Sequence, residues 1–392
     1  MITRQLDPRT EVITVQPSAL LYETLRDFVP FPSDRRYPLI LPYGYHMIHF
    51  LTNVRLSALL PDGTDAIQSP GPPFTRRMWG GGSISFRRPI ILNNSMFRCE
   101  ERIADVQVKG QGNDQKVFVK IERAVYLVMN PIEQGNAGGI WPPYLVETRT
   151  LVFMREGRQK AAAGTTTSSP KALKPMQTPD FSHTIIPTAS LLFRFSALTF
   201  NAHAIHLDKQ YCRDVEGHRN LLVHGPLSLV LMLQILDDHF RIAGREGFRE
   251  VIRSVEYRNL APLYAEEEMK VCIKRKGDIA GFGSWDVWIE GRDGGYGVKG
   301  TVRTARTPRR VWQAEVGAIV QAGAKEGDST SLKENIDLET KSASAAETSI
   351  EDETIPHNTP APSKNRASEV EHSREEGVEE GVEEENAPYF QR

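Results

Sequence analysis

The sequence predicts an α+β protein of two folded domains, built from curled antiparallel sheet around an apolar helix and followed by a disordered acidic tail. The chain has 392 residues, which is too long for one domain when a domain holds roughly 150 residues. One helix, starting near residue 225, is apolar nearly all round and is followed by several strands. Hydrophobic residues make up 40% and charged residues 25% of the chain, as in ordinary globular proteins.

Two breaks in composition divide the chain. Residues 161–170 are small, polar and aperiodic, which is typical of a linker. From residue 323 onward, 18 acidic residues accompany 7 basic ones, and aromatic and branched apolar residues are few. Such a segment cannot bury enough surface to offset its ordering entropy. We therefore expect an N-terminal domain over 1–155, a linker over 156–180, a C-terminal domain over 181–322 and a disordered tail over 323–392.

The secondary structure of the two domains follows from hydrophobic periodicity. In the N-terminal domain, strands are expected over 117–128 and 145–154, separated by glycine-rich turns. In the C-terminal domain, Pro226 predicts a helix beginning at Gly225, because proline at the first helical position gives up an amide that would be unpaired anyway. Residues 227–236 are almost all apolar, so other structure must wrap this helix. Strands are expected over 254–257, 269–274, 285–290 and 295–304.

Composition also excludes several classes of protein. No run reaches the about 18 apolar residues of a membrane-spanning helix, and neither a membrane nor a nucleic-acid partner is expected. Cys99, Cys212 and Cys272 are too few and too scattered for a disulfide framework, which favours a reducing compartment. Asp7 and Glu11 do not fit a mitochondrial leader, and no secretory signal is seen.

Charge is unevenly distributed along the chain. The tail carries a net charge of −11, and the remainder carries +9, within a total of −2. A mildly basic body suits an anionic substrate, such as a coenzyme A phosphate or an acidic carrier protein. Scattered charge on a solvated surface would give the same balance.

A polar segment directly before the apolar helix holds the candidate site. Asn201, His203, His206 and Asp208 lie within eight positions, and the helix begins at Gly225. An imidazole with a pKa near 6.5 can take or return a proton at neutral pH. A helix N-terminus offers unpaired amides and partial positive charge, which an enolate oxygen requires. Together these groups supply the parts for reversible elimination of water from an acyl thioester.

This segment resembles the MaoC-like, (R)-specific hydratase branch of the hot-dog superfamily. The motif of that branch is Asp-x-Asn-Pro-x-His, followed by His-Gly at the start of the central helix. In the alignment, Asn201 takes the place of the family Asp, His203 that of its Asn, Ala204 that of its Pro and His206 that of the catalytic His. Gly225 takes the place of the glycine whose amide forms the oxyanion hole.

A narrower resemblance is to the type 2 hydroxyacyl-thioester dehydratases of eukaryotic mitochondria and to mesaconyl-CoA hydratases. Two strings carry it, residues 199–206 and residues 76–82 with Phe86 and Pro89, and it spans about residues 30–305. It implies a double hot-dog fold, in which two curled antiparallel sheets each wrap a central helix and a degenerate N-terminal half shapes an acyl tunnel. The implied function is a hydro-lyase, an (R)-3-hydroxyacyl thioester dehydratase or enoyl thioester hydratase of mitochondrial fatty-acid synthesis.

The resemblance also implies partners and location. The substrate would be an acyl-CoA or acyl carrier protein thioester, and no cofactor is implied. The location would be mitochondrial, or otherwise cytoplasmic, and a homodimer stays open.

The resemblance assigns roles to single residues. His206, Asn201 and Gly225 form the expected catalytic set. Because the amide of Asn201 cannot act as a base at pH 7, His206 is expected to carry the proton while Asn201 holds water or the leaving hydroxyl. The expected substrate-binding residues are His203, Asp208, Trp79 and Arg258. Arg258 could meet a phosphate of the pantetheine carrier, but it also fits a surface position at the end of a strand, which is the favoured assignment. Trp79 also fits core packing, with the glycines after it permitting a tight turn or close backbone approach.

Three alternatives accompany this hypothesis. A zinc site is disfavoured, because no helical i, i+3 pair or Cys pair completes a ligand set; its ligands would come from His203, His206, Asp208, Cys212, His218 and His224. Hydration of a branched or dicarboxylic enoyl-CoA of the mesaconyl type is a close variant, since Ala204 stands where the narrower relatives are expected to have Arg. A non-catalytic acyl-thioester-binding protein is favoured by Asn201, Ala204 and the acidic tail.

Overall fold

A computed structural model describes residues 4–30, 39–128, 142–155, 173–242, 247–279 and 282–308, with four single positions between 310 and 317. All of these lie in one compact unit, Met1–Ile336. The expected tail and most of the expected linker fall outside the described residues. The domain boundaries given above therefore stay predictions.

The described residues form one antiparallel sheet of eleven strands. Their order in the sheet is β1-β4-β5-β6-β3-β8-β11-β10-β9-β7, and β2 also pairs with β4. The strands are β1 (Arg4–Gln5), β2 (Arg9–Val12), β3 (Arg76–Phe86), β4 (Met96–Lys109), β5 (Lys116–Leu127), β6 (Leu145–Met154), β7 (Phe181–Ile185), β8 (Phe248–Asn259), β9 (Met269–Ile279), β10 (Phe282–Glu290) and β11 (Tyr296–Pro308).

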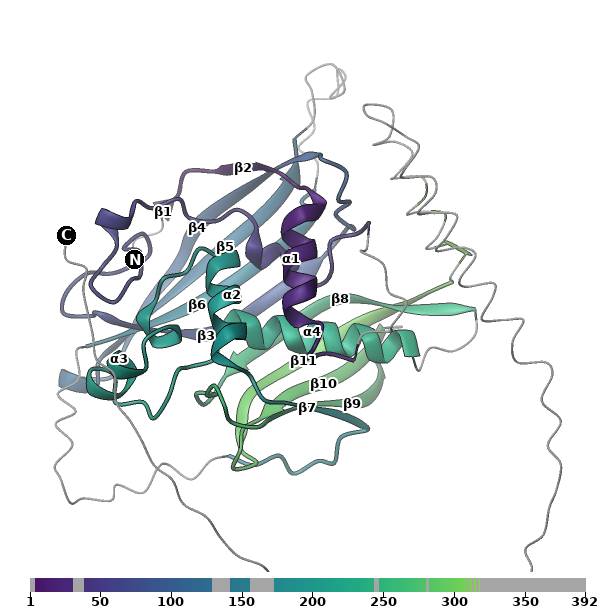
Figure 1. Cartoon of the computed structure of the whole chain (residues 1–392). Coiled ribbons are helices and arrows are strands. Elements are labelled where there is room, and N and C mark those ends of the chain that lie inside the picture. The colour runs from purple at the N-terminus through teal and green to yellow at the C-terminus, as the bar shows by residue number, and fades with distance from the viewer. Residues whose placement is uncertain are drawn as a thin grey trace, which may run out of the picture. The chain divides into compact units, whose positions relative to one another are not determined.

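The strand order repeats itself on either side of the β3–β8 pair. Outward from β3 the order is β6, β5, β4, with β2 on β4; outward from β8 it is β11, β10, β9, with β7 on β9. In Figure 1 the blue N-terminal strands and the green C-terminal strands meet at this junction. The chain therefore contains two copies of one sheet topology, which is the architecture of a double hot-dog.

Helix α4 (Gly225–Ile242) fills the C-terminal copy. It contacts β8, β9 and β10, and also β3 of the other copy. Residues 229–233 are fully buried on all sides of the helix, as an apolar helix wrapped by sheet requires. The predicted start of this helix at Gly225 is confirmed.

The N-terminal copy has no long counterpart of α4 among its described residues. Its helix α1 (Val15–Leu25) corresponds in order to α2 (Ala189–Leu198), and the two contact each other. Between α1 and β3, residues 39–75 contain two short 3-10 turns, Tyr45–Ile48 and Leu56–Ala58, where the other copy has α3 (Lys209–Asp214) and α4. The N-terminal half is thus the degenerate one, and the concave side of its sheet is left partly uncovered.

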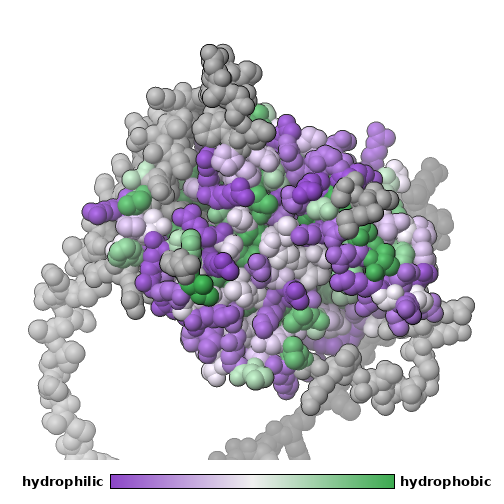
Figure 2. Space-filling model, turned by 180° about the vertical axis from the view of Figure 1, so that it is seen from behind, coloured by the Kyte–Doolittle hydropathy of each residue, from purple (hydrophilic) through white to green (hydrophobic). Residues whose placement is uncertain are grey.

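Much of the opposite face of the sheet is turned to solvent, but on β9, β10 and β11 Cys272, Trp288 and Tyr296 form a small buried cluster there. Figure 2, seen from behind relative to Figure 1, shows a largely hydrophilic surface with scattered apolar spots. Exposed ion pairs such as Arg102–Glu122, which joins β4 and β5, lie on such outward positions. A one-sided antiparallel sheet has this alternation. Within the described residues, no helix combines the length and apolar character needed to cross a membrane.

The predicted strands are all present, and most extend beyond the predicted limits. The expectation of a tight turn at residues 80–82 is wrong, because these glycines lie inside β3, at a register shift between Trp79 and Gly81. Close backbone approach is confirmed instead: a Cβ on Gly81 (φ +132°) would lie 2.3 Å from the Tyr257 carbonyl oxygen. Only glycine permits β3 to approach β8 so closely at this bulge.

Candidate active site

One cavity of about 510 Å³ lies between the two copies of the fold. This volume is within the range of small-molecule sites. Its walls come from the uncovered concave side of β5 and β6, from β3, from the chain after α2, and from the first turn of α4. A further wall comes from residues between 47 and 68, the part of the N-terminal copy that corresponds in chain order to α3 and α4.

His206 lies on this wall, on the 3-10 turn Ala204–His206. Its Nδ1 is 2.8 Å from the carbonyl oxygen of Leu222. Because a carbonyl only accepts, Nδ1 carries the proton and donates, and Nε2 keeps its lone pair. Burial lowers the pKa of His206 to about 4, and the charge of Arg77 lowers it while the bond to Leu222 acts the other way. The imidazole is therefore neutral at pH 7 and is available as a proton acceptor.

A second imidazole fixes the plane of the first. The ring of His224 stacks on His206 with centroids 3.6 Å apart and planes 22° apart. His224 is fully buried, and its Nε2 is 2.8 Å from the Ser196 hydroxyl. Burial lowers the pKa of His224 well below its usual value, so this neighbour adds no positive charge at pH 7.

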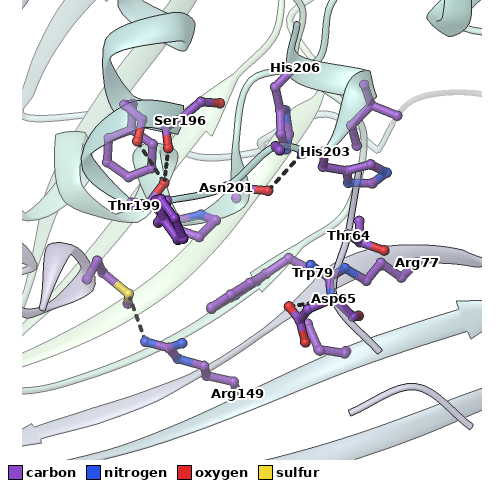
Figure 3. Close-up of a pocket in the computed structure, with 18 of the residues that line it drawn as sticks. Thr64, Asp65, Arg77, Trp79, Arg149, Ser196, Thr199, Asn201, His203 and His206 are labelled. Atoms are coloured by element: carbon purple, nitrogen blue, oxygen red, sulfur yellow. Dashed lines mark hydrogen bonds and ion pairs between the residues drawn. The ribbon is translucent and has the colours of Figure 1, made fainter. Parts of the chain in front are cut away.

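Asn201 is held beside the histidines by a sharp turn after α2. Phe200 has φ +52°, and the Asn201 amide donates to the Ser196 carbonyl at 2.8 Å. The side-chain oxygen of Asn201 accepts from the backbone N–H of His203 at 3.1 Å, as the dashed line in Figure 3 shows. Within the described part of the chain, no acceptor takes the N–H groups of Nδ2, so the amide can donate to a ligand in the cavity.

Gly225 supplies a backbone amide at the start of α4. The first hydrogen bond within the helix runs from Ser228 N–H to the His224 carbonyl, so the Gly225 amide has no helical acceptor. A Cβ here would lie 2.6 Å from Asn259 Nδ2 and 3.0 Å from Trp79 Cβ. Glycine is needed because β3 and β8 close directly over the helix start. An open amide at a helix N-terminus is suited to holding an anion.

Trp79 is both packed and exposed to the cavity. Its Nε1 donates to the Tyr257 hydroxyl at 2.8 Å, and its carbonyl accepts from Asn259 Nδ2 at 2.8 Å. The guanidinium of Arg149 lies over the indole, with Cζ 5.0 Å from the ring centroid. The two interpretations of Trp79, core packing and contact with ligand, are therefore compatible in one side chain.

His203 also reaches the cavity. Its Nε2 is 3.5 Å from Asp62 Oδ2. Burial, followed by the charges of His206 and Arg77, lowers the pKa of His203 to about 2, so it too is neutral at pH 7. His203 can hydrogen-bond to a ligand but does not add charge to the site.

Two of the expected substrate-binding residues do not line the cavity. Asp208 is exposed, and its carboxylate accepts from the amides of Gln210 and Tyr211 as the N-cap of α3. Arg258 is exposed on β8, next to buried Tyr257. Because side chains alternate across a strand, the inward position of Tyr257 turns Arg258 away from the cavity.

Several wall residues carry polar groups that the sequence hypothesis did not include. Arg77 has its Nη1 3.6 Å from Asp65 Oδ2 and lies near His203 in Figure 3. Arg77 belongs to the 76–82 string that carries the family resemblance, and this could have indicated it as a site residue. Arg149 belongs to no motif, so the sequence did not indicate it. Among the described residues, no group of three or more His, Cys, Asp or Glu side chains is arranged to hold a metal ion.

Comparison with known proteins gives consistent results. The model of the family "hydroxyacyl-thioester dehydratase type 2" matches residues 44–265. The mitochondrial hydroxyacyl-thioester dehydratase type 2 of Schizosaccharomyces pombe is 29% identical over 250 residues, covering 60% of this chain and 78% of that protein. The mesaconyl-C(4)-CoA hydratase of Chloroflexus aurantiacus is 29% identical over 265 residues, covering 67% and 83%.

Solved structures show the same fold at lower identity. One named MaoC-like dehydratase has a TM-score of 0.53 at 12% identity, covering 77% of this chain and 97% of its own. A MaoC-like dehydratase from Phytophthora capsici has a TM-score of 0.50 at 14% identity, covering 77% and 95%. At such identities the likeness concerns the fold alone.

Proposed function

Because the chain belongs to the hydroxyacyl-thioester dehydratase type 2 family, we propose that it catalyses the reversible removal of water from (R)-3-hydroxyacyl thioesters in this cavity. The observation that carries the proposal is that two groups lie on the same wall: a neutral His206, whose Nε2 has no hydrogen-bond partner among the described residues, and the amide of Gly225. Together they provide a proton acceptor and an oxyanion donor, the two groups that the reaction needs.

The mechanism uses His206 for both proton transfers. In the hydration direction, Nε2 takes a proton from water held by Asn201 while the oxygen attacks C3 of the enoyl thioester. The thioester oxygen gains negative charge and accepts a hydrogen bond from the Gly225 amide. The imidazolium then returns its proton to C2, so that one water is added across the double bond. Once protonated, an imidazole with a pKa of about 4 is a stronger acid than an ordinary imidazolium, which favours transfer of the proton to C2.

The relatives' names differ over the acyl group and agree over the type of reaction. Two name hydroxyacyl thioesters, and both are mitochondrial; one names a mesaconyl thioester. We propose a mitochondrial setting for this chain on that basis. Comparing coenzyme A thioesters with carrier-protein thioesters as substrates will show which carrier the enzyme uses. The homodimer stays a prediction.

The test of the proposal is hydration of 2-enoyl-CoA substrates, followed as loss of enoyl absorbance over several chain lengths and with CoA and carrier-protein thioesters. Turnover that yields the (R)-3-hydroxy product supports the proposal. Absence of turnover on every thioester, with binding retained, would favour the non-catalytic acyl-binding protein.

Replacing Asn201 with alanine is expected to lower kcat about 10- to 100-fold, since the amide positions water but transfers no proton. Part of the loss comes from the turn, because the bond to the His203 amide is lost as well. Steady-state hydration rates measure the effect. Asn201→Asp keeps the bond to the His203 amide and adds a carboxylate that can accept a proton, so its kcat should be higher than that of Asn201→Ala. A folded Asn201→Ala variant with the wild-type kcat would contradict the role of Asn201 in holding water.

The pH profile is expected to be flat from neutral pH down to about pH 5 and to fall below it. His206 acts when neutral, and its pKa is lowered from 6.5 to about 4, so activity is lost only as pH falls through that value. The unfolded chain takes up protons on this histidine at a higher pH than the folded chain, so stability falls between pH 6.5 and 4. The fraction folded must therefore be followed by circular dichroism at each pH. A midpoint near 6.5 in folded protein would contradict the buried, neutral imidazole.

A further inference from the structure

An arginine with uncommitted donors lies on the cavity wall beyond Trp79. Arg149 on β6 lines the cavity and is 17% exposed. Its Nε donates to Glu147 Oε1 at 2.7 Å, while its Nη2 is 3.3 Å from the sulfur of Met47. A thioether is a weak acceptor. Within the described residues no oxygen accepts from either terminal nitrogen of Arg149.

The pairing of the neighbouring charges leaves the Arg149 guanidinium open to a ligand. Arg123 is nearly fully buried between Glu101 at 3.2 Å and Glu147 at 3.3 Å. Arg9 donates to Glu101 at 2.9 Å and to the Phe50 carbonyl. Glu147 therefore interacts with both Arg123 and Arg149, and it leaves the terminal nitrogens of Arg149 available for a ligand.

The carboxylate beneath Arg149 is itself ionised. Burial acts to raise its pKa, but Arg149, His46 and Arg123 together hold the pKa of Glu147 well below its usual range. Removing Arg149 leaves Glu147 paired with Arg123, so the buried carboxylate keeps a partner. Substituting Arg149 can therefore test the role of its terminal nitrogens without leaving a buried carboxylate unpaired.

The position of Arg149 corresponds to the distal part of an acyl group. The indole of Trp79 lies against the start of α4 on one side and under the guanidinium of Arg149 on another. In Figure 3, Trp79 separates Arg149 from the loop that carries Asn201 and His206. An acyl group whose thioester oxygen meets Gly225 and which extends past Trp79 reaches Arg149.

We propose that Arg149 binds a carboxylate on the acyl group, so that the preferred substrates are thioesters of dicarboxylic acids. This rests on the proposed function. A guanidinium recognises a carboxylate through two parallel hydrogen bonds. A purely alkyl chain at the same place would displace water from the terminal nitrogens without replacing its hydrogen bonds, which is unfavourable. Arg149 thus selects for a carboxylated acyl group and against a methyl-ended one.

The test compares matched substrates, the CoA thioesters of straight-chain 2-enoic acids with four to eight carbons and their ω-carboxylated counterparts. At one chain length, the wild type is expected to show at least a roughly tenfold higher kcat/KM for the carboxylated member. Arg149→Met, which keeps the length of the side chain, is expected to lower the ratio of the two kcat/KM values about 30-fold. Arg149→Lys keeps the charge without the fork and should give an intermediate ratio.

Arg102→Met is the matched control, because Arg102 pairs with Glu122 on the exposed face, at 2.8 Å, and its change should leave the ratio as in the wild type. Preference for the methyl-ended member at every length would overturn the proposal. An equal loss on both members in Arg149→Met would also overturn it, since a structural role through Glu147 has that signature.

Calorimetric binding of the unreactive saturated thioesters, hexanoyl-CoA and adipyl mono-CoA, separates this proposal from the proposed function. If no substrate is turned over, the hydratase proposal fails. The carboxylate site still stands when adipyl-CoA binds about tenfold more tightly than hexanoyl-CoA and Arg149→Met removes the difference. Equal affinities in folded wild-type protein would overturn it.

Discussion

Replacing His206 with alanine is expected to lower kcat for enoyl-thioester hydration by about 10²- to 10⁴-fold, the usual contribution of a positioned acid–base group. The loss should fall at the upper end, because Asn201 cannot take over proton transfer as a carboxylate could. Binding of a saturated acyl-CoA should change little, since the group removed contributes to proton movement and not to holding the acyl chain. Steady-state rates and calorimetry measure the two effects separately.

His218→Ala serves as the control for this change. His218 is a nearby histidine that neither lines the cavity nor stacks on His206, and its Nδ1 is 3.2 Å from the Tyr264 hydroxyl. Because His206 stacks on His224, the melting temperature of both variants must be compared with that of the wild type. A folded His206→Ala variant that keeps more than about a tenth of the activity would place the proton acceptor elsewhere.

Much of the C-terminal fold was predictable from local patterns. Pro226 and the apolar run after it indicate the start of α4, because proline is favoured in the first turn of a helix and a helix that is apolar on all sides must be buried. The strands β9, β10 and β11 follow from alternation and turn residues. The polar loop with Asn201 and His206 lies where the motif and the helix start indicated, on the same cavity wall as Gly225.

Other features depend on pairing between distant segments. Three glycines in a row favour a turn locally, yet here they lie in β3 because the neighbouring backbones of β6 and β8 come too close for a Cβ: on Gly82 it would lie 2.0 Å from the Thr148 carbonyl oxygen. No local pattern reports that crowding. The side to which Arg258 points depends on which face of β8 packs against α4. The order of α4 and β8 along the chain does not determine that face.

Arg149 illustrates the same limit for the site. Along β6, Arg149 lies between two threonines and two positions after Glu147, and charged residues in a one-sided sheet usually take outward positions. It points instead to the concave side, which is open to the cavity because the described residues of the N-terminal copy contain no counterpart of α4. Arg149 is part of the cavity wall because of how the whole chain folds around this open side, which no local pattern along β6 reports.

Replacing Gly225 with alanine is expected to lower kcat about 10²- to 10³-fold, the range found when one oxyanion donor is lost. The added Cβ would lie 2.6 Å from Asn259 Nδ2 and 3.0 Å from Trp79 Cβ, so the helix start and Trp79 must move apart. That movement strains the bond from Asn259 to the Trp79 carbonyl and takes the amide out of line with the thioester oxygen. Overpacking of this kind also costs about 1–3 kcal/mol of stability.

Gly283→Ala separates crowding from catalysis. A Cβ at Gly283 would lie 2.5 Å from Thr304 Oγ1, which is comparable crowding against a polar side-chain atom, but Gly283 on β10 does not line the cavity. Both variants should lose melting temperature to a similar extent, and kcat should fall only in Gly225→Ala. If the two variants lose stability alike and both keep the wild-type kcat, the Gly225 amide does not hold the enolate oxygen, and the negative charge must be met by another donor on this wall, of which Arg77 lies near His206 and is the first to substitute.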